Sequence, residues 1–178
     1  ERTENSIPPK PLSAQETAEL ISLIKQPPEG EADFLMELLA NRIPPGVDEA
    51  AYVKASFLSA IAKNDEICDL ISRESAIKLL GNMLGGYNID TLISLLEDQA
   101  LGEIAADQLK NLVLVYDAFH DVVALASKGV KTAESVLNSW ANAEWFTARA
   151  PVAESMKAVI FKVSGETNTD DLSPAQDA

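Results

Sequence analysis

The sequence predicts a mainly α-helical chain, a HEAT-like helical-repeat (α-solenoid) domain that is followed by a short segment of β character. Apolar residues recur at helical spacing through roughly the first 150 residues, in segments that prolines and glycines separate. Residues 38–47 resemble residues 79–88, 41 positions further along, and this spacing is typical of stacked helical pairs. After Pro151, the segment Lys157–Val163 is β-branched and aromatic and too short for another helix, which indicates a strand.

The N-terminal part predicts an extended arm and a well-defined first helix. Residues 1–12 contain several prolines and are expected to be extended. Ser13 and Glu16 have the spacing of a capping box, in which each side chain accepts a hydrogen bond from the other residue's backbone N–H. The helix that begins there is expected to end at Pro27-Pro28.

The following segments predict a run of further helices. Four of them have these limits: 31–41, Asp48 to Ile61, Ser72 to Gly81, and 89–97. The longest is expected over about 101–127, and it is apolar on much of its circumference, which is typical of an enclosed helix. After Gly129, a single last helix is expected to carry Trp140, Trp145 and Phe146.

Composition narrows the functional classes. The chain has 178 residues, 47% of them hydrophobic, so it can bury a core and is not disordered throughout. Its net charge of -14 repels phosphate backbones and disfavours direct RNA or DNA binding. The apolar runs are too short to cross a membrane, and residues 1–30 have no signal-peptide pattern. One cysteine, Cys68, excludes an internal disulfide and a cysteine-rich metal site, and suits the reducing cytoplasm.

Few residues suggest chemistry in the helical part. His120 has Asp117 three positions before it, but a lone histidine among aromatic residues is more often structural than a base or a ligand. Cys68 is flanked by acidic residues, whose negative charge disfavours a thiolate, so a reactive thiol is not expected there. The aromatic cluster around Trp140 and Trp145 could stack a base or a sugar, but core or a domain-packing seam is the better interpretation.

Two loops contain residue types that are typical of ligand-binding loops. Residues 85–88 begin with two glycines, but no strand precedes them and no Lys-Ser/Thr follows, so a phosphate loop is rejected in favour of a helix corner with positive φ. Residues 165–174 gather two adjacent carboxylates and several hydroxyls after the predicted strand. Such a loop is equally consistent with a substrate pocket and with an Asx-rich surface loop.

Four motifs carry a resemblance to a known family. They are Pro44–Ala55, Leu80–Ile89, Ser139–Phe146 and Phe161–Ala175. In this order they closely resemble the N-terminal region of the bacterial aconitase B family, and the resemblance covers nearly the whole chain. It implies an arm over 1–12, a HEAT-like domain over 13–152, and the start of a truncated α/β swivel domain over 153–178.

The resemblance implies an activity for the complete enzyme. The family consists of hydro-lyases that interconvert citrate and isocitrate through cis-aconitate and also dehydrate 2-methylisocitrate. Their [4Fe-4S] cluster, held by three cysteines further along the chain, acts as a Lewis acid. We therefore expect the present 178 residues to hold no cofactor, no metal and no catalytic residue, and to be inactive alone.

The resemblance also implies site residues and partners. Asp170, with Thr169 and Ser173 as weaker candidates, matches a swivel-domain motif that orients the tricarboxylic acid substrate. The helical domain is expected to form a homodimer and to pack on the catalytic part so as to control substrate access, in a cytoplasmic enzyme. Two alternatives are a free-standing helical-repeat adaptor and, more weakly, an RNA-binding regulator, which the acidic charge disfavours.

Overall fold

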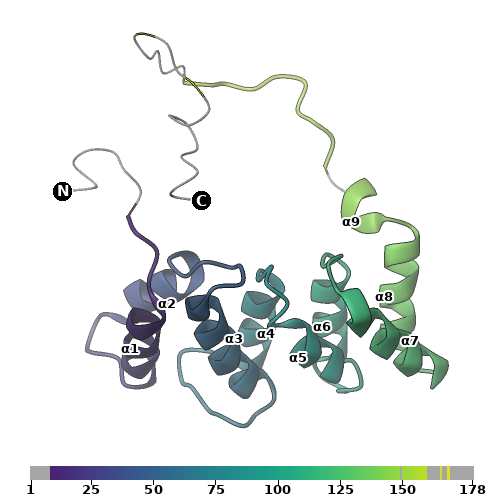
Figure 1. The fold of residues 1–178 in the computed structure, drawn as a ribbon, viewed down its shortest axis with the longest axis horizontal. Coiled ribbons are helices and arrows are strands. Elements are labelled where there is room, and N and C mark those ends of the chain that lie inside the picture. The colour runs from purple at the N-terminus through teal and green to yellow at the C-terminus, as the bar shows by residue number, and fades with distance from the viewer. Residues whose placement is uncertain (1–8, 149, 160–164, 166–167, 169–178) are drawn as a thin grey trace. The chain divides into compact units, whose positions relative to one another are not determined.

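The computed structural model describes residues 9–148, 150–159, 165 and 168 and divides the chain into two units, Glu1–Ala148 and Arg149–Ala178. The described residues form helices and no named strand (Figure 1). The helices are α1 (Ala14–Lys25), α2 (Ala32–Asn41), α3 (Glu49–Ala62), α4 (Arg73–Gly81), α5 (Ile89–Ser94), α6 (Gly102–Leu109), the 3-10 helix η1 (Tyr116–Ala118), α7 (Phe119–Ser127), α8 (Lys131–Ala141) and α9 (Glu144–Thr147).

Successive helices of the first unit pack in pairs. α1 packs on α2, α3 on α4, α5 on α6 and α7 on α8, while α1–α3, α4–α6 and α6–α8 contacts join one pair to the next. The pairs follow one another in chain order along the unit (Figure 1). This arrangement is mainly helical, as the sequence predicts, and its classification as a HEAT-like solenoid stays a prediction.

Three predicted helix starts are confirmed by their caps. The Ser13 N–H donates to Glu16 Oε2 at 2.8 Å and the Glu16 N–H donates to Ser13 Oγ at 3.3 Å, which completes the capping box. Asp48 Oδ1 accepts from the Ala51 N–H at 3.0 Å, and Ser72 Oγ accepts from the Ser75 N–H at 3.1 Å. Local sequence therefore fixes where α1, α3 and α4 begin.

A continuous apolar core runs through the helix pairs. Its largest fully buried side chains are Ile24, Leu39, Leu58, Ile61, Ile71, Ile77, Leu80, Met83, Leu92, Leu96, Leu109 and Val122. Many residues of α3 and α4 lie in this core, whereas α2 buries only two. Leu35 and Leu39 are buried while Phe34 is exposed, because α2 packs mainly on α1 and buries only the side of the helix that faces it.

The single long helix predicted over about 101–127 is wrong. α6 ends at Leu109, residues 112–115 are outside any helix, and α7 begins only at Phe119. Three features explain the break: the Asn111 side chain donates to the Asp107 carbonyl, the apolar run that follows contains two β-branched valines, and Tyr116 has a positive φ of 45°. Apolar content alone had suggested continuity.

The single last helix is also divided. α8 ends at Ala141, and Ala143 takes a left-handed conformation with φ 52° before the short α9 carries Trp145 and Phe146. In the second unit, residues 157–159 lie in no helix or strand, and the remainder of the predicted strand Lys157–Val163 lies outside the described residues. The strand therefore stays a prediction.

Connections between helices alternate between two edges of the first unit (Figure 1). The upper edge consists of four of these connections with the helix residues next to them, residues 42–52, 82–88, 110–119 and 142–148. The lower edge consists of the other connections with the helix residues next to them, residues 23–34, 62–73, 95–101 and 128–132. The two names refer to the view in Figure 1, where these loops lie above and below the row of helices.

Candidate functional site

The upper edge of the first unit concentrates exposed apolar side chains. Ten of the large apolar side chains that are exposed in the described residues lie there: Val47, Tyr52, Leu84, Tyr87, Val113, Leu114, Tyr116, Phe119, Trp145 and Phe146. The lower edge has three, Leu23, Phe34 and Ile67. Single exposed apolar residues are ordinary, but a row of them along one edge marks an interaction surface.

The first two loops of the upper edge hold each other closely. The Leu84 N–H donates to the Pro45 carbonyl at 2.7 Å, and the Tyr87 hydroxyl donates to the Val47 carbonyl at 2.9 Å. Gly85 lies against Gly46 so closely that a Cβ at Gly85 would be 2.0 Å from the Gly46 carbonyl oxygen. These loops are the two copies of the 41-residue similarity, so the structure brings them side by side.

Aromatic rings line the rest of this edge. The Tyr52 and Tyr87 rings meet edge-on with centroids 5.3 Å apart, and the Trp145 and Phe146 rings lie 5.7 Å apart. Phe119 stacks on Trp140 at 6.1 Å. Phe119 and Trp145 are both about 40% exposed, so each ring still offers a face to a partner.

The predicted aromatic cluster near the end of the helical part is split by the structure. Trp140 is half-buried against the core, and its indole N–H donates to the Leu109 carbonyl at 2.9 Å. Phe146, by contrast, is 65% exposed. The cluster thus includes a core residue and a surface residue.

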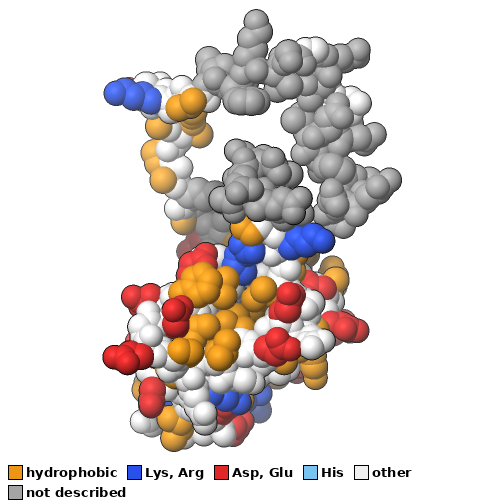
Figure 2. Space-filling view, turned by 90° about the vertical axis from the view of Figure 1, so that its left-hand side faces the viewer, with side chains coloured by type: hydrophobic (Ala, Val, Ile, Leu, Met, Phe, Trp, Pro, Cys, Tyr) orange, Lys and Arg blue, Asp and Glu red, His pale blue; other side chains and the backbone are white. Residues whose placement is uncertain are grey.

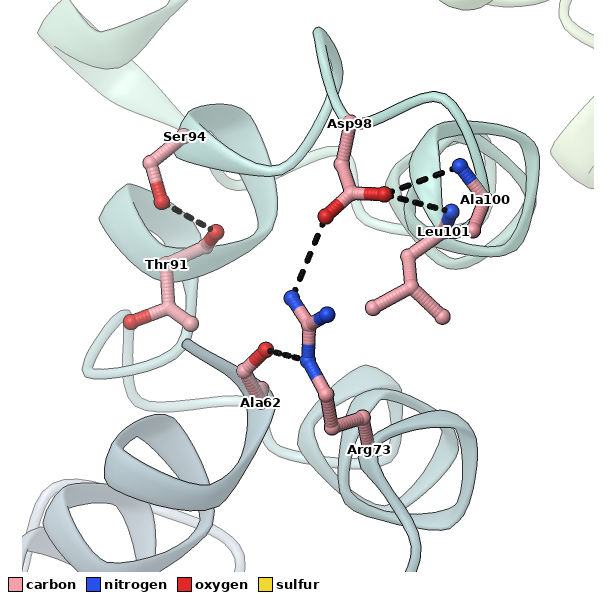
Figure 3. A network of polar contacts seen from close by, with 7 residues as sticks. All are labelled: Ala62, Arg73, Thr91, Ser94, Asp98, Ala100 and Leu101. Atoms are coloured by element: carbon pink, nitrogen blue, oxygen red, sulfur yellow. Dashed lines mark hydrogen bonds and ion pairs between the residues drawn. The ribbon is translucent and has the colours of Figure 1, made fainter. Parts of the chain in front are cut away.

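The lower edge is held by polar contacts between helix pairs (Figure 3). Arg73 donates from Nε to the Ala62 carbonyl at 2.8 Å and from its guanidinium to Asp98 at 3.1 Å. The other oxygen of Asp98 accepts from the N–H groups of Ala100 and Leu101 just before α6. These backbone donors, followed by Arg73, lower the pKa of Asp98.

Lys54 is a buried cation near the upper edge. Its side chain is almost completely enclosed, and Nζ donates to the Ala40 carbonyl at 3.3 Å. Burial lowers the pKa of this ammonium group. The carbonyl lies in the last turn of α2, where the helix dipole favours a positive charge, so Lys54 joins α3 to α2.

The residues of the helical unit that the sequence analysis considered for a chemical role, His120 and Cys68, have no catalytic partner among the contacts described. His120 is exposed, and its ring packs edge-on against the Phe119 ring with the centroids 5.8 Å apart. Cys68 is half-buried and is a free thiol. The corner at residues 85–88 has Gly86 at φ 88°, which confirms the predicted helix corner. Asp170, Thr169 and Ser173 lie outside the described residues, so their role stays a prediction.

Two further properties of the described part of the chain concern metal binding and membrane crossing. It holds no group of three or more His, Cys, Asp or Glu residues that could bind a metal ion, so these residues do not fit an iron-sulfur cluster. None of its helices combines the length and the apolar character that crossing a membrane would require.

Three elements of the molecule were missed from the sequence. The apolar upper edge, the Arg73–Asp98 contact and buried Lys54 all depend on which helices become neighbours. One signal was available for the first, because Val47, Leu84 and Tyr87 are large apolar residues inside Gly- and Pro-rich breaks. Large apolar residues in loops indicate contact with something beyond the loop.

The first unit has a second apolar area on its end face, which is formed by α1 and α2. Hydrophobic side chains gather near the centre of this end face, with acidic side chains on both sides and Lys or Arg side chains above and below (Figure 2). Leu23 and Phe34, which also belong to the lower edge, are the large apolar residues that α1 and α2 leave exposed. This end face has fewer large exposed apolar side chains than the upper edge, and charged side chains surround them.

Comparisons with known proteins agree with the motif resemblance. Residues 1–146 match the family described as the Aconitate B N-terminal domain. The whole chain is 56% identical to proteins named aconitate hydratase B from Pseudomonas aeruginosa and Salmonella typhimurium, and 54% identical to the one from Escherichia coli. It spans about a fifth of the length of these relatives.

Proposed function

We propose, because this chain belongs to the aconitase B family, that it is the N-terminal helical domain of a hydro-lyase and serves the assembly of that enzyme. The enzyme would interconvert citrate and isocitrate through cis-aconitate in the cytoplasm, and also dehydrate 2-methylisocitrate. Its [4Fe-4S] cluster would be bound by cysteines that this chain lacks. The proposed role of the described helices is association and control of substrate access, with no chemical step of their own.

The apolar upper edge is the observation that supports this role. Tyr116 is 81% exposed, Val47 is 76% exposed, and eight further large apolar side chains lie on the same edge. Burying each such side chain against a partner contributes about 1–2 kcal/mol, so covering the edge supplies a strong driving force for association. We propose that the catalytic part of the enzyme covers the upper edge and that the substrate path runs between them.

Homodimerisation is assigned to a different surface. We propose that the end face of α1 and α2, with Leu23 and Phe34, meets its counterpart in a second copy. A two-fold interface would bring the charged borders of the two copies together, and these borders are acidic at the sides of the patch and basic above and below it. Since each chain has a net charge of -14, the dimer is expected to strengthen as salt screens the repulsion.

Hydrogen exchange tests the assembly role directly. The amides of residues 84–87 and 112–116 are expected to exchange at least tenfold more slowly in the full-length enzyme than in this 178-residue chain, because the partner surface excludes water. Residues 63–70 of the lower edge serve as the internal control and are expected to exchange at the same rate in both. Equal exchange at the upper edge would contradict the proposal.

The adaptor alternative makes a different prediction. A free-standing helical-repeat adaptor would use the same apolar edge, but for a separate protein, and the catalytic part of an aconitase would not protect it. The swivel-domain residues Asp170, Thr169 and Ser173 also separate the two functions. In the enzyme, Asp170→Asn is expected to lower turnover at unchanged stability, since the carboxylate is proposed to orient substrate.

A further inference from the structure

The end face of α1 and α2 carries its charges in an alternating order around the apolar centre. Acidic side chains lie on both sides of the centre, and Lys or Arg side chains lie above and below it (Figure 2). Figure 2 keeps the vertical direction of Figure 1, so above and below correspond to the upper and the lower edge. Around this face, each charged sector is therefore followed by a sector of the opposite sign.

The cations of the end face lie at the two ends of the helix pair. Residues 9–48 contain three Lys or Arg residues, Lys10, Lys25 and Arg42. Arg42 follows the last residue of α2 at the upper edge, and its guanidinium donates to the Lys10 carbonyl at 2.7 Å, so both residues lie at that end. Lys25 is the last residue of α1, at the lower edge, and it pairs with Glu66. Lys10 has no ion pair among those described, so its charge is available to a partner.

The carboxylates belong to the exposed sides of the same two helices. Glu16 and Glu19 are exposed on α1, and Asp33 and Glu37 are exposed on α2. Glu16 belongs to the capping box, and Glu19 accepts a hydrogen bond from Gln15 Nε2 at 3.0 Å. Within the described residues, none of these four carboxylates has an ion pair. Both sides of the face therefore keep negative charge that the chain itself does not neutralise.

This order of charges restricts how two copies can meet. In a dimer with a two-fold axis in the plane of the interface, each sector of one face meets the sector of the other copy that is its mirror image across the axis. If the axis runs along the helices or straight across them, sides meet sides and ends meet ends, so like charges face each other. If the axis runs diagonally, the basic ends of each copy meet the acidic sides of the other.

We propose that two copies of this chain pair through the end face with their α1–α2 pairs crossed at close to a right angle. In this arrangement, the end with Lys10 and Arg42 contacts carboxylates of the second copy. The inference rests on the homodimer of the proposed function and adds its geometry. Each chain has a net charge of -14, so opposing the carboxylates of the two faces would add to a repulsion that burial of Leu23 and Phe34 must already offset. Charges at the border of an interface select the orientation of the partners more than they raise affinity.

Sedimentation equilibrium of the 178-residue chain tests this geometry. Lys10→Glu is expected to weaken dimerisation about tenfold, because the two-fold axis places the reversed charge against carboxylates at two points. Lys128→Glu is the matched control, since it makes the same change in net charge at the C-terminal end of α7, away from this face. It is expected to weaken dimerisation by about twofold at most, through the net charge alone. Equal dimerisation of the two variants would overturn the inference.

A second substitution identifies the side that the upper end contacts. Glu19→Lys on α1 and Glu37→Lys on α2 are each combined with Lys10→Glu, which returns the net charge to -14 in both double variants. A diagonal axis joins the upper end to one side only. One double variant is therefore expected to dimerise as the native chain does, while the other stays as weak as Lys10→Glu. Rescue by both substitutions, or by neither, would contradict the crossed arrangement.

The same measurements report the proposed homodimer separately. A native chain that stays monomeric at every concentration reached would overturn the homodimer, and the geometry with it. A native chain that dimerises, with Lys10→Glu behaving like Lys128→Glu, would overturn the geometry and leave the homodimer standing.

Discussion

The two edges of the helical unit are built differently from the same helices. At the lower edge, polar groups join successive helix pairs: Arg73 contacts Asp98, Thr132 donates to the Leu96 carbonyl, and Lys25 pairs with Glu66. At the upper edge, backbone contacts and aromatic rings join the loops, and large apolar side chains remain exposed beside them. At the lower edge, polar side chains therefore join helix pairs within the chain, while the upper edge keeps apolar surface that a partner can bury.

This difference separates residues that stabilise the domain from residues that connect it to something else. Contacts between neighbouring loops stabilise the fold itself, and the contact of Gly85 with Gly46 is an example at the upper edge. The exposed apolar side chains of the upper edge contribute little to the isolated fold, because they are already in water in both the folded and the unfolded chain. Substitutions can test each half of this statement.

Gly85→Val is expected to have the largest effect, because it disrupts the contact on which the upper edge is built. A Cβ at this position would lie 2.0 Å from the Gly46 carbonyl oxygen, and that neighbour is backbone and cannot rotate away. The expected loss is about 2–4 kcal/mol of unfolding free energy, measured by urea denaturation. Gly46→Ala is the control, since a Cβ there meets nothing within 4 Å. Equal losses in the two variants would contradict the packing described.

Arg73→Ala tests the lower edge and is expected to have a smaller effect. The variant loses the hydrogen bond to the Ala62 carbonyl and the contact with Asp98, both partly exposed to solvent. We expect a loss of about 1 kcal/mol in the urea unfolding free energy. Lys128→Ala, a lysine beside the lower-edge turn that has no ion pair among those described, is the control. An unchanged midpoint for Arg73→Ala would mean that the polar contacts do not hold this edge.

The pH dependence of Asp98 sharpens the same point. Its pKa in the folded chain lies below the ordinary value of 3.8, so the carboxylate form favours folding. This contribution is fully present above the ordinary value and is lost as the pH falls through the lower, folded-state pKa. The stability difference between the native chain and Asp98→Asn is therefore expected to shrink on acidification. Unfolding curves from neutral pH to below this range check it, and a constant difference would refute it.

Tyr116→Ser is expected to have the smallest effect on stability. The side chain is 81% exposed, so the unfolding free energy should change by less than about 0.5 kcal/mol. In the full-length enzyme, by contrast, the same substitution is expected to weaken the protection of the upper edge from hydrogen exchange. Ile67→Ser at the lower edge is the matched control, with a side chain that is 83% exposed. Equal effects of the two substitutions on the enzyme would remove the distinction between the edges.

The parts of the fold that were predictable are those set by local chemistry. Ser13 was expected to cap a helix, and Asp48 and Ser72 were expected to begin helices. All three are caps in the structure, since a cap depends on residues within one turn. The prediction of one long helix over 101–127 is wrong because the apolar residues continue through a segment in which the backbone is not helical. The positive φ of Tyr116 is the decisive feature there, and it cannot be predicted from the conformational preference of tyrosine.

The candidate surface was less predictable than the fold. Apolar residues such as Leu114 and Phe119 were assigned to an enclosed helix, because sequence gives the periodicity of a face and not what covers it. The resemblance to the family was predicted and is confirmed, but it comes from matched motifs, not from the physical chemistry of single side chains. The role of Asp170 lies outside what the described residues test.

The packing of each helix pair on its neighbours in chain order has a consequence for biosynthesis. Contacts between nearby segments form quickly, so the helical unit can fold while the ribosome is still translating the rest of the proposed enzyme. At ordinary elongation rates, that remainder takes on the order of a minute to appear. During this interval, the upper edge is exposed on a nascent chain, and the net charge of -14 repels other nascent copies. In the proposed assembly, the catalytic part covers this edge only afterwards.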